Sequence, residues 1–218
     1  MSHFTQSNHL KRLLCFGDSL TEGHTGGFCT VMKPYGDVLQ SLMSADCVCG
    51  RVVVSGTSGE ETSSMISRLE SQLRKADRES QHFSLVVLLG GTNDVGRGKS
   101  AEETFENLKL MYDCVAAHGA KLCAVTLPEN GVTEKDPVFQ WLEPARSGVN
   151  NKIRHFVEAH RGSCFLFDLD KAIPHAYRGT GNEELWGDTL HLSAKGYNEF
   201  AQQLWACMKR ELEIPTSV

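Results

Sequence analysis

Three side chains in two short stretches of the sequence have the types that nucleophilic catalysis needs. Ser19 lies in FGDSLTEG (16–23), and Asp188 and His191 lie in WGDTLH (186–191). A serine hydroxyl is a weak nucleophile unless a base takes its proton, and that base needs a third group to orient it. If Asp188 and His191 share a turn, the carboxylate accepts Nδ1–H of the imidazole and Nε2 faces Ser19 Oγ. Such a set of side chains would attack a carbonyl carbon.

Attack on a carbonyl also requires hydrogen-bond donors for the oxyanion that forms. The backbone N–H of Gly59, where no side chain blocks a close approach, and the carboxamide of Asn93 are groups of the right kind. Each residue also has a purely structural explanation. Gly59 permits a positive φ, Asn93 with Asp94 is typical of an Asx turn, and Gly-Asp-Ser is common in turns. Asp188 and His191 are equally compatible with a surface pair near a helix start.

The elements that would position these residues alternate along the chain. Strand-like apolar runs, each followed by turn residues and helical periodicity, occur at Arg12–Phe16, Cys47–Val54, Leu85–Leu89, Leu122–Leu127 and Cys164–Leu169. This alternation predicts an α/β fold with a parallel sheet covered by helices on both faces. Ligands of such sheets bind beyond the carboxyl ends of the strands, where all the candidate residues fall. Their co-occurrence at the predicted strand ends favours a catalytic role.

Several helix boundaries can also be predicted. Ser100 with Glu103 forms a capping box, Gly119 stands at the expected helix end, and Ser193 caps the last helix. Thr57 with Glu60 is predicted to open the second helix in the same way. The last helix carries one apolar stripe that we assign to the core: Tyr197, Phe200, Ala201, Leu204, Trp205 and Met208. The segment Glu129–Ser147, with Pro137 and Pro144, is predicted to be a long loop.

Composition limits the class of protein. The 218 residues, 40% of them hydrophobic, predict a single domain over 1–218 with a polar N-terminal extension at 1–11. The net charge of −5 and the absence of a basic block argue against a nucleic-acid partner. No apolar run approaches the roughly 20 residues of a membrane span, and no signal peptide is recognisable, so we expect a cytoplasmic protein. The eight cysteines are expected to be reduced, mostly buried, and not to bind a metal.

Four stretches together resemble the GDSL-type, or SGNH, hydrolase family. FGDSLTEG is similar to its first block, SGTSGEET to its second, GGTND to its third and DTLHLSAKGY to its last. The resemblance implies a flavodoxin-like three-layer α/β/α fold with parallel strand order 2-1-3-4-5. It implies Ser19 as nucleophile, His191 as base and Asp188 as its orienting group, with Ser19 N–H, Gly59 N–H and Asn93 as oxyanion donors. Two positions depart from the family pattern: Ser55 occupies the place of a common Asn, and Leu192 that of a common Pro.

The expected activity is therefore hydrolysis of small acyl esters, short-chain or acetyl, through an acyl-enzyme and without a cofactor. Lysophospholipase or acyl-thioesterase activity on the same site remains an alternative, as does a catalytically silent flavodoxin-like binding protein. A metal-dependent phosphoesterase would instead use Asp18, Asp94, Asp188 and His191 as ligands. An α/β-hydrolase is a weaker alternative, because Thr21 stands where the second Gly of its G-x-S-x-G elbow should be.

Substrate recognition is expected from three loops, Gly23–Met32, Glu129–Ser147 and Pro174–Gly187. Within the first, His24–Phe28 either lines the acyl or alcohol pocket or forms a flexible loop. Trp141 and Trp186 are candidates for an apolar wall. The oligomeric state is left open.

Overall fold

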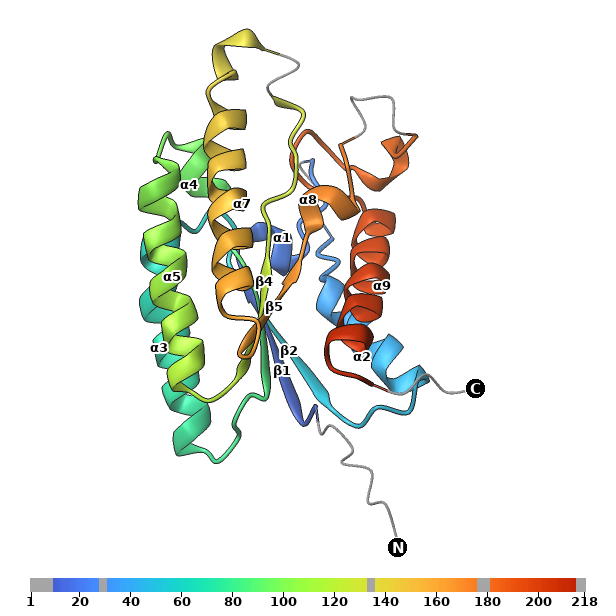
Figure 1. The fold of residues 1–218 in the computed structure, drawn as a ribbon. Helices are drawn as coiled ribbons and strands as arrows, with labels where there is room; N and C mark the ends of the chain where they lie inside the picture. The colour runs from blue at the N-terminus through green and yellow to red at the C-terminus, as the bar shows by residue number, and fades with distance from the viewer. Residues whose placement is uncertain (1–9, 28–30, 133–135, 176–180, 215–218) are drawn as a thin grey trace, which may run out of the picture.

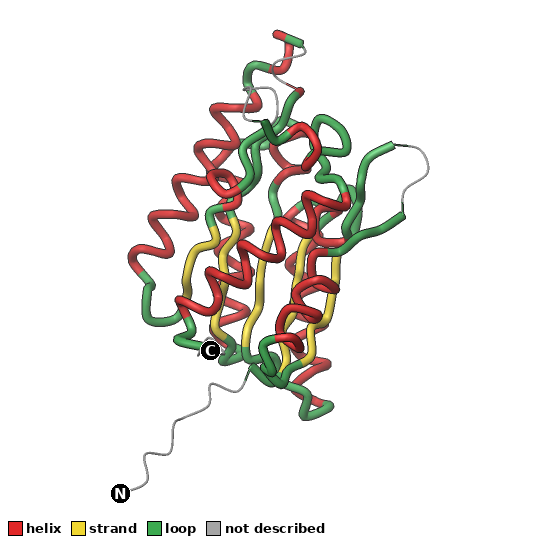
Figure 2. The backbone as a smooth tube through the Cα atoms, turned by 90° about the vertical axis from the view of Figure 1, so that its right-hand side faces the viewer, coloured by secondary structure: helices red, strands yellow, loops and turns green. Residues whose placement is uncertain are grey.

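A five-stranded parallel sheet forms the centre of the molecule (Figures 1 and 2). The structure, a computed structural model, describes residues 10–27, 31–132, 136–175 and 181–214. The strands are β1 (Arg12–Gly17), β2 (Arg51–Gly56), β3 (Leu85–Leu89), β4 (Lys121–Val125) and β5 (Cys164–Phe167). Their order is β2-β1-β3-β4-β5, with all neighbours parallel. The predicted fold class and strand order are confirmed.

Helices cover both faces of this sheet (Figure 1). On one face lie α3 (Thr62–Arg78), α5 (Ala101–Ala117) and α7 (Leu142–Ala159), and on the other α2 (Tyr35–Ala45) and α9 (Ala194–Glu211). The shorter helices are α1 (Ser19–Glu22), α4 (Thr92–Gly96) and α8 (Leu169–Ala172), with 3₁₀ turns at Pro137–Phe139 and Glu183–Leu185. The connections after the strands gather at the carboxyl edge of the sheet, so residues distant in sequence meet there.

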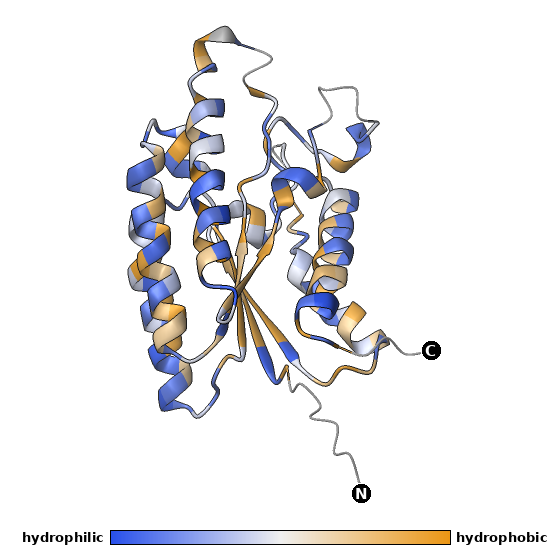
Figure 3. Cartoon of the chain, viewed as in Figure 1, coloured by the Kyte–Doolittle hydropathy of each residue, from blue (hydrophilic) through white to orange (hydrophobic). Residues whose placement is uncertain are grey.

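The strands are apolar on both faces because each face packs against helices (Figure 3). In β1, Leu13 and Cys15 join the core beneath α2 and α9, whereas Leu14 and Phe16 join the core beneath α3, α5 and α7. This alternation follows from the two-residue period of a strand. The predicted stripe of the last helix is buried in the first of these cores. Leu10 belongs to it as well, so the polar extension predicted for residues 1–11 does not include this side chain.

The capping residues are confirmed at three of the four predicted positions. Ser100 Oγ accepts the N–H of Glu103, Ser193 Oγ accepts the N–H of Gly196, and Gly119 takes a φ of 80° just past α5. The prediction for Thr57 with Glu60 is wrong, because α3 begins only at Thr62. The intervening residues form a turn at the carboxyl edge of the sheet instead.

Two further boundaries differ from the prediction. Residues 142–147 belong to α7 and not to a loop. Pro144 is compatible with the helix because it lies in the first turn, where a backbone N–H would have no partner within the helix. The second strand begins at Arg51 and not at Cys47, because Cys47 follows α2 with a φ of 55°. A residue in this conformation cannot extend a strand.

The described cysteines are free, and Cys15, Cys123, Cys164 and Cys207 are buried. Burial raises the pKa of the Cys15 thiol to about 12 and that of Cys207 to about 11, so both stay protonated. Among the described residues, no helix combines the length and the apolar character that crossing a membrane requires.

Candidate active site

Ser19 is the first residue of α1, the short helix that follows β1. The chain turns sharply here: a Cβ on Gly17 would lie 2.3 Å from the Leu89 carbonyl oxygen, so the position has no room for a side chain. Asp18 caps the helix, with Oδ1 accepting the N–H of Leu20 at 3.0 Å. Gly23 ends the helix with a φ of 88°. These residues fix the backbone on both sides of Ser19, which is 7% exposed.

His191 joins Ser19 to Asp188 through its two ring nitrogens. Nε2 lies 3.1 Å from Ser19 Oγ, and Nδ1 lies 2.9 Å from Asp188 Oδ2. The structure thus brings together the three residues that the sequence singled out, from positions 172 residues apart for Ser19 and His191. Their order, hydroxyl to imidazole to carboxylate, is the one in which an imidazole can take a hydroxyl proton.

The segment carrying Asp188 and His191 is a tight loop closed by the bridge between Trp186 and Leu192. Gly187 N–H donates to the His191 carbonyl oxygen at 2.8 Å within it. Leu192, which departs from the family pattern, is fully buried in the core beneath α9. An apolar residue at this position therefore anchors the loop. Trp186, a candidate for an apolar wall, is buried in the same core.

Asp188 is held in its ionised form. Partial burial by itself would raise its pKa, but hydrogen bonds from the His191 ring and from the backbone N–H groups of His191 and Leu190 outweigh it. The result is a pKa well below the usual range. The carboxylate therefore remains an acceptor for Nδ1–H throughout the neutral pH range.

Asp18, next to Ser19, behaves differently. It is fully buried, and burial raises its pKa to about 7, against the lowering effect of the hydrogen bond from Leu20. Its Oδ2 has no hydrogen-bond partner among the described residues. Asp18 is thus a buried capping carboxyl, and its role here is to hold the turn before Ser19.

Gly59 and Asn93, the predicted oxyanion donors, lie in neighbouring loops. Asn93 Nδ2 donates to the Glu60 carbonyl oxygen at 3.0 Å, which occupies one of its two amide hydrogens. No N–H of a described residue donates to Asn93 Oδ1, so the alternative Asx turn with Asp94 is not formed. Gly59 has a φ of 76°, and a Cβ there would meet only Arg97, at 4.0 Å. Its conformation, and not crowding by protein atoms, is what requires glycine.

A network that sequence reasoning missed holds these loops together. Glu22 Oε2 accepts the N–H and the hydroxyl of Ser58, and the Asp94 carboxylate accepts the N–H and the hydroxyl of Thr62. The first pair joins α1 to the loop after β2, and the second joins the start of α3, where that loop ends, to α4. The sequence contains one signal for this network: Glu22 in FGDSLTEG and Asp94 in GGTND are acidic residues that each follow the end of a predicted strand.

Arg68 is the largest of the missed contributors. From α3 its guanidinium donates to the carbonyl oxygen of Gly17, to Oγ and the carbonyl oxygen of Ser55, and to the carboxylate of Glu60. It lies over the ring of Phe16, 4.0 Å from the centroid. The hydroxyl of Ser55, the second departure from the family pattern, thus serves as a partner of Arg68.

An apolar cavity of about 80 Å³ lies between the connections that follow β3, β4 and β5. It is lined by Thr92, the neighbour of Asn93, and by Leu190, the neighbour of His191. Most of its other lining side chains are apolar: Val95, Leu127, Val132 and Leu142. Each of the three predicted recognition loops includes residues outside the described part of the chain, namely 28–30, 133–135 and 176–180.

Residues 15–198 match the model of the GDSL-like lipase/acylhydrolase family. The chain belongs to this family. The match covers all four sequence blocks and every side chain described above, from Gly17 to His191. No curated protein matches the chain in sequence.

Solved structures with the GDSL fold superpose over most of the chain. A lipase/acylhydrolase from Enterococcus faecalis has a TM-score of 0.73 at 21% identity, covering 95% of this chain and 100% of the other. A carbohydrate acetylesterase family member from Sinorhizobium meliloti has a TM-score of 0.70 at 19% identity, covering 93% and 99%. The structure named TesA has a TM-score of 0.68 at 23% identity, covering 92% and 99%. At these identities the superpositions show that the fold is shared.

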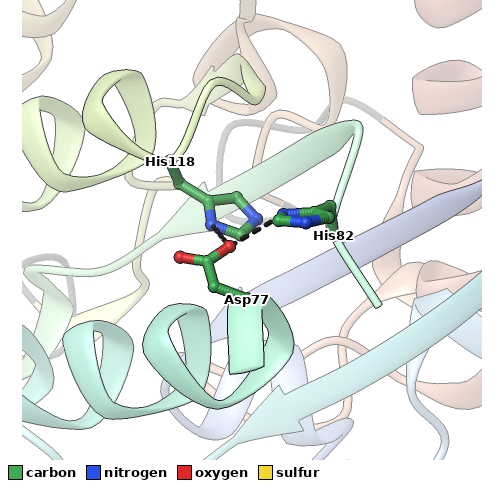
Figure 4. Close-up of side chains that lie close together, drawn as sticks. All are labelled: Asp77, His82 and His118. Carbon is green, nitrogen blue, oxygen red and sulfur yellow. Dashed lines mark ion pairs between the residues drawn. The ribbon is translucent and has the colours of Figure 1, made fainter. Parts of the chain in front are cut away.

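In the described part of this GDSL-family chain, the four ligands of the phosphoesterase alternative do not form a group of three or more, although Asp188 and His191 are in contact. Among the described residues, the one group of three His, Cys, Asp or Glu ligand atoms close enough to hold a metal ion is Asp77, His82 and His118 (Figure 4). These residues come from the end of α3 and from the segments entering β3 and β4, at the edge of the sheet opposite Ser19.

The geometry of this group disfavours a metal. Nδ1 of His82 and Nδ1 of His118 each lie 2.8 Å from Asp77 Oδ1 (Figure 4). His118 Nε2 accepts the N–H of Phe83 at 3.1 Å, so in the neutral ring the proton is on Nδ1 and no lone pair is available there. We assign the group to the packing of α3 and α5 on the amino edge of the sheet.

Proposed function

We propose that the chain is a serine esterase in which Ser19 is the nucleophile, His191 the general base and Asp188 the group that orients it. The observation that carries this proposal is the pair of contacts made by His191, 3.1 Å to Ser19 Oγ and 2.9 Å to Asp188 Oδ2. Membership of an acylhydrolase family supports the same reaction class.

In the proposed mechanism, Ser19 Oγ attacks the ester carbonyl carbon and its proton passes to His191 Nε2. The oxyanion of the tetrahedral intermediate accepts hydrogen bonds from Ser19 N–H, Gly59 N–H and the Asn93 amide. Collapse of the intermediate breaks the bond to the alcohol oxygen, which takes the proton from His191. Water, deprotonated by His191, then attacks the acyl-enzyme, and the acid leaves with Ser19 restored.

The proposed oxyanion donors are supported by the way in which their loops are tied together. Asn93 is oriented by its bond to the Glu60 carbonyl oxygen, and its second amide hydrogen is left for a ligand. Gly59 lies between Ser58, which is held by Glu22, and Glu60, which accepts from Arg68. Donors fixed in advance stabilise an oxyanion without reorganisation cost, and each is worth roughly 10²- to 10³-fold in rate.

For the substrate we propose small esters with a short acyl chain. The cavity of about 80 Å³ lined by Thr92 and Leu190, the neighbours of Asn93 and His191, has room for roughly three groups the size of a water molecule, which matches an acyl chain of about that many carbons. A carbohydrate acetylesterase family member is among the similar structures, and an acetyl group would also fit. Lysophospholipids and acyl thioesters are alternative substrates that would use the same Ser19.

The test is the substitution Ser19→Ala, assayed with p-nitrophenyl butyrate. We expect kcat to fall by at least about 10⁴-fold while the fold is retained, because the nucleophile is removed from a turn that tolerates alanine. Ser67→Ala, an exposed position on α3, is the matched control and should leave kcat unchanged. Retention of most activity by Ser19→Ala would overturn the assignment.

Two further outcomes distinguish the alternatives. A rate that is unchanged by EDTA agrees with the proposal, whereas strong inhibition reversed by a metal ion would favour the phosphoesterase. A folded wild-type protein that hydrolyses none of a panel of acetyl, butyryl and octanoyl esters, acetylated sugars, lysophospholipids and acyl-CoA would favour a binding protein without catalysis.

A further inference from the structure

His24 is held on several sides within the candidate active site. Its backbone N–H donates to the Ser19 carbonyl oxygen at 3.0 Å, and its carbonyl oxygen accepts the Tyr197 hydroxyl of α9 at 2.8 Å. Its half-buried imidazole packs against the ring of His191, with the centroids 4.4 Å apart and the planes tilted by 44°. The described part of the His24–Phe28 stretch, residues 24–27, is thus attached at His24 both to Ser19 and to α9.

The residues after His24 pack closely against the loop of Asp188 and His191. A Cβ on Gly187 would lie 1.9 Å from the Thr25 carbonyl oxygen, and a Cβ on Gly26 would lie 2.6 Å from Asp188 Oδ2. Glycines at these positions therefore allow the segment 24–26 to contact the loop directly. This contact fixes where the His24 ring lies relative to His191.

The hydrogen bonding of the His24 ring determines its tautomer. Nδ1 accepts the N–H of Gly26 at 3.2 Å, so Nδ1 carries the lone pair and the neutral ring has its proton on Nε2. No described residue accepts a hydrogen bond from that Nε2–H. A half-buried donor that is held in place but has no protein acceptor is available to a ligand.

The surroundings of this donor indicate which part of an ester it would meet. Gly26 bonds to His24 Nδ1, and Asp188 bonds to His191 Nδ1. Because Gly26 lies against Asp188, the Nδ1 atoms of the two rings face the same region. His191 Nε2 faces Ser19, where the leaving alcohol oxygen must lie to receive its proton. The apolar cavity is lined mainly by residues that follow β3 and β4, whereas His24 follows β1.

We propose that His24 is a specificity-determining residue whose Nε2–H donates a hydrogen bond to the alcohol part of the ester. The enzyme would then prefer esters whose alcohol carries an oxygen near the ester bond, as in polyols and sugars, over esters of simple alkanols. This inference rests on the proposed esterase function of Ser19.

The test compares glycerol 1-monobutyrate with n-propyl butyrate, which share the acyl group and the carbon chain of the alcohol and differ only in hydroxyl groups. His24→Phe keeps a ring against His191 but has no donor, whereas His24→Gln keeps an N–H near the position of Nε2. The ratio of kcat/KM for the two esters is measured on one enzyme sample, so an unfolded fraction affects both values equally. His155→Phe, at an exposed position on α7, is the matched control.

We expect the wild-type ratio to favour the glycerol ester, and to fall about five- to tenfold in His24→Phe, as the loss of one neutral hydrogen bond predicts. His24→Gln should keep most of the wild-type ratio, and His155→Phe all of it. An unchanged ratio in His24→Phe, or a wild-type enzyme that is active without preferring the glycerol ester, would overturn the role of His24. A folded wild-type protein inactive on both esters and on p-nitrophenyl butyrate would overturn the esterase function itself, and the role of His24 with it.

Discussion

The carboxylate of Glu22 accepts two hydrogen bonds from Ser58, one from the backbone N–H and one from the hydroxyl. Glu22 ends the helix that begins at Ser19, and Ser58 precedes Gly59. The Glu22 side chain therefore links the loop of a proposed oxyanion donor directly to the helix of the proposed nucleophile. The two belong to connections that follow different strands, β1 and β2.

Removal of this link should impair catalysis more than binding. In Glu22→Ala the loop at Gly59 loses its attachment to α1, and a donor displaced by about 1 Å can cost up to 10²-fold in rate. We expect kcat for p-nitrophenyl butyrate to fall by about 10- to 100-fold, with KM changed by less than about threefold. Glu158→Ala, an exposed acidic residue of α7, should leave both constants unchanged. An equal loss of activity in the control, or none in Glu22→Ala, would contradict the assigned role.

Asp188→Asn tests the orienting group. The amide accepts Nδ1–H less strongly than a carboxylate does, and it favours the wrong tautomer of His191. We expect kcat to fall by about 10³- to 10⁴-fold, as in comparable sets of serine, histidine and aspartate. Steady-state kinetics with p-nitrophenyl butyrate measure it, with Asp113→Asn on the exposed side of α5 as the control. A loss of less than about tenfold would show that Asp188 does not orient the base.

Asp18 should make the stability of the protein depend on pH in an unusual direction. Its pKa in the folded protein is about 7, above its ordinary value of 3.8, so the folded state binds the proton more tightly. Proton binding by Asp18 therefore stabilises the folded protein fully at acid pH, and this contribution is lost as the pH rises from about 4 through 7. Asp18→Asn keeps an acceptor for the N–H of Leu20 but does not titrate.

The measurement is urea unfolding of wild type and Asp18→Asn at pH 5 and pH 8. At each pH we take the free energy of unfolding of Asp18→Asn minus that of wild type. This difference should be larger at pH 8 than at pH 5 by more than about 1 kcal/mol, since one pKa unit corresponds to about 1.4 kcal/mol. Because the comparison is made within each protein, any constant cost of the amide cancels. A difference that is independent of pH, or that falls, would show that the Asp18 carboxyl is ionised at acid pH.

Much of this arrangement could be predicted from the sequence because it depends on local patterns. The apolar run of β3 matches the strand residue for residue, and Ser100 and Ser193 cap helices through bonds to residues three positions away. Parallel strands put their carboxyl ends at one edge, so Ser19 and His191 were expected to meet without any knowledge of side-chain packing.

What could not be predicted depends on contacts between distant elements. Arg68 is an ordinary polar position of an amphipathic helix in the sequence, and only the packing of α3 shows that it bonds to the ends of β1 and β2. The start of α3 was misplaced because Thr57 and Glu60 have the capping pattern, yet the chain turns there to present Gly59. For His24 the sequence leaves two interpretations open, a pocket lining or a flexible loop, and only the packing of its ring on that of His191 places it in the site.

Val132 tests the acyl cavity. It is half-buried on the cavity wall, so Val132→Phe should fill part of the 80 Å³ and lower kcat/KM for butyryl esters relative to acetyl esters by about tenfold. Val132→Ala should shift the preference towards hexanoyl esters. A p-nitrophenyl ester series measures both, and Val138→Phe, at a side chain that is 73% exposed, should leave the series unchanged. An identical series in all four proteins would place the acyl chain elsewhere.

The central claim, that Ser19 is the activated nucleophile of this site, is tested most directly by covalent labelling. The protein is incubated with a fluorophosphonate, digested and analysed by mass spectrometry. We predict a single adduct, on the peptide that contains Ser19, that is absent from Ser19→Ala and strongly reduced in His191→Ala. An active enzyme that carries no label on Ser19, or a label on another residue that persists in Ser19→Ala, would contradict the account.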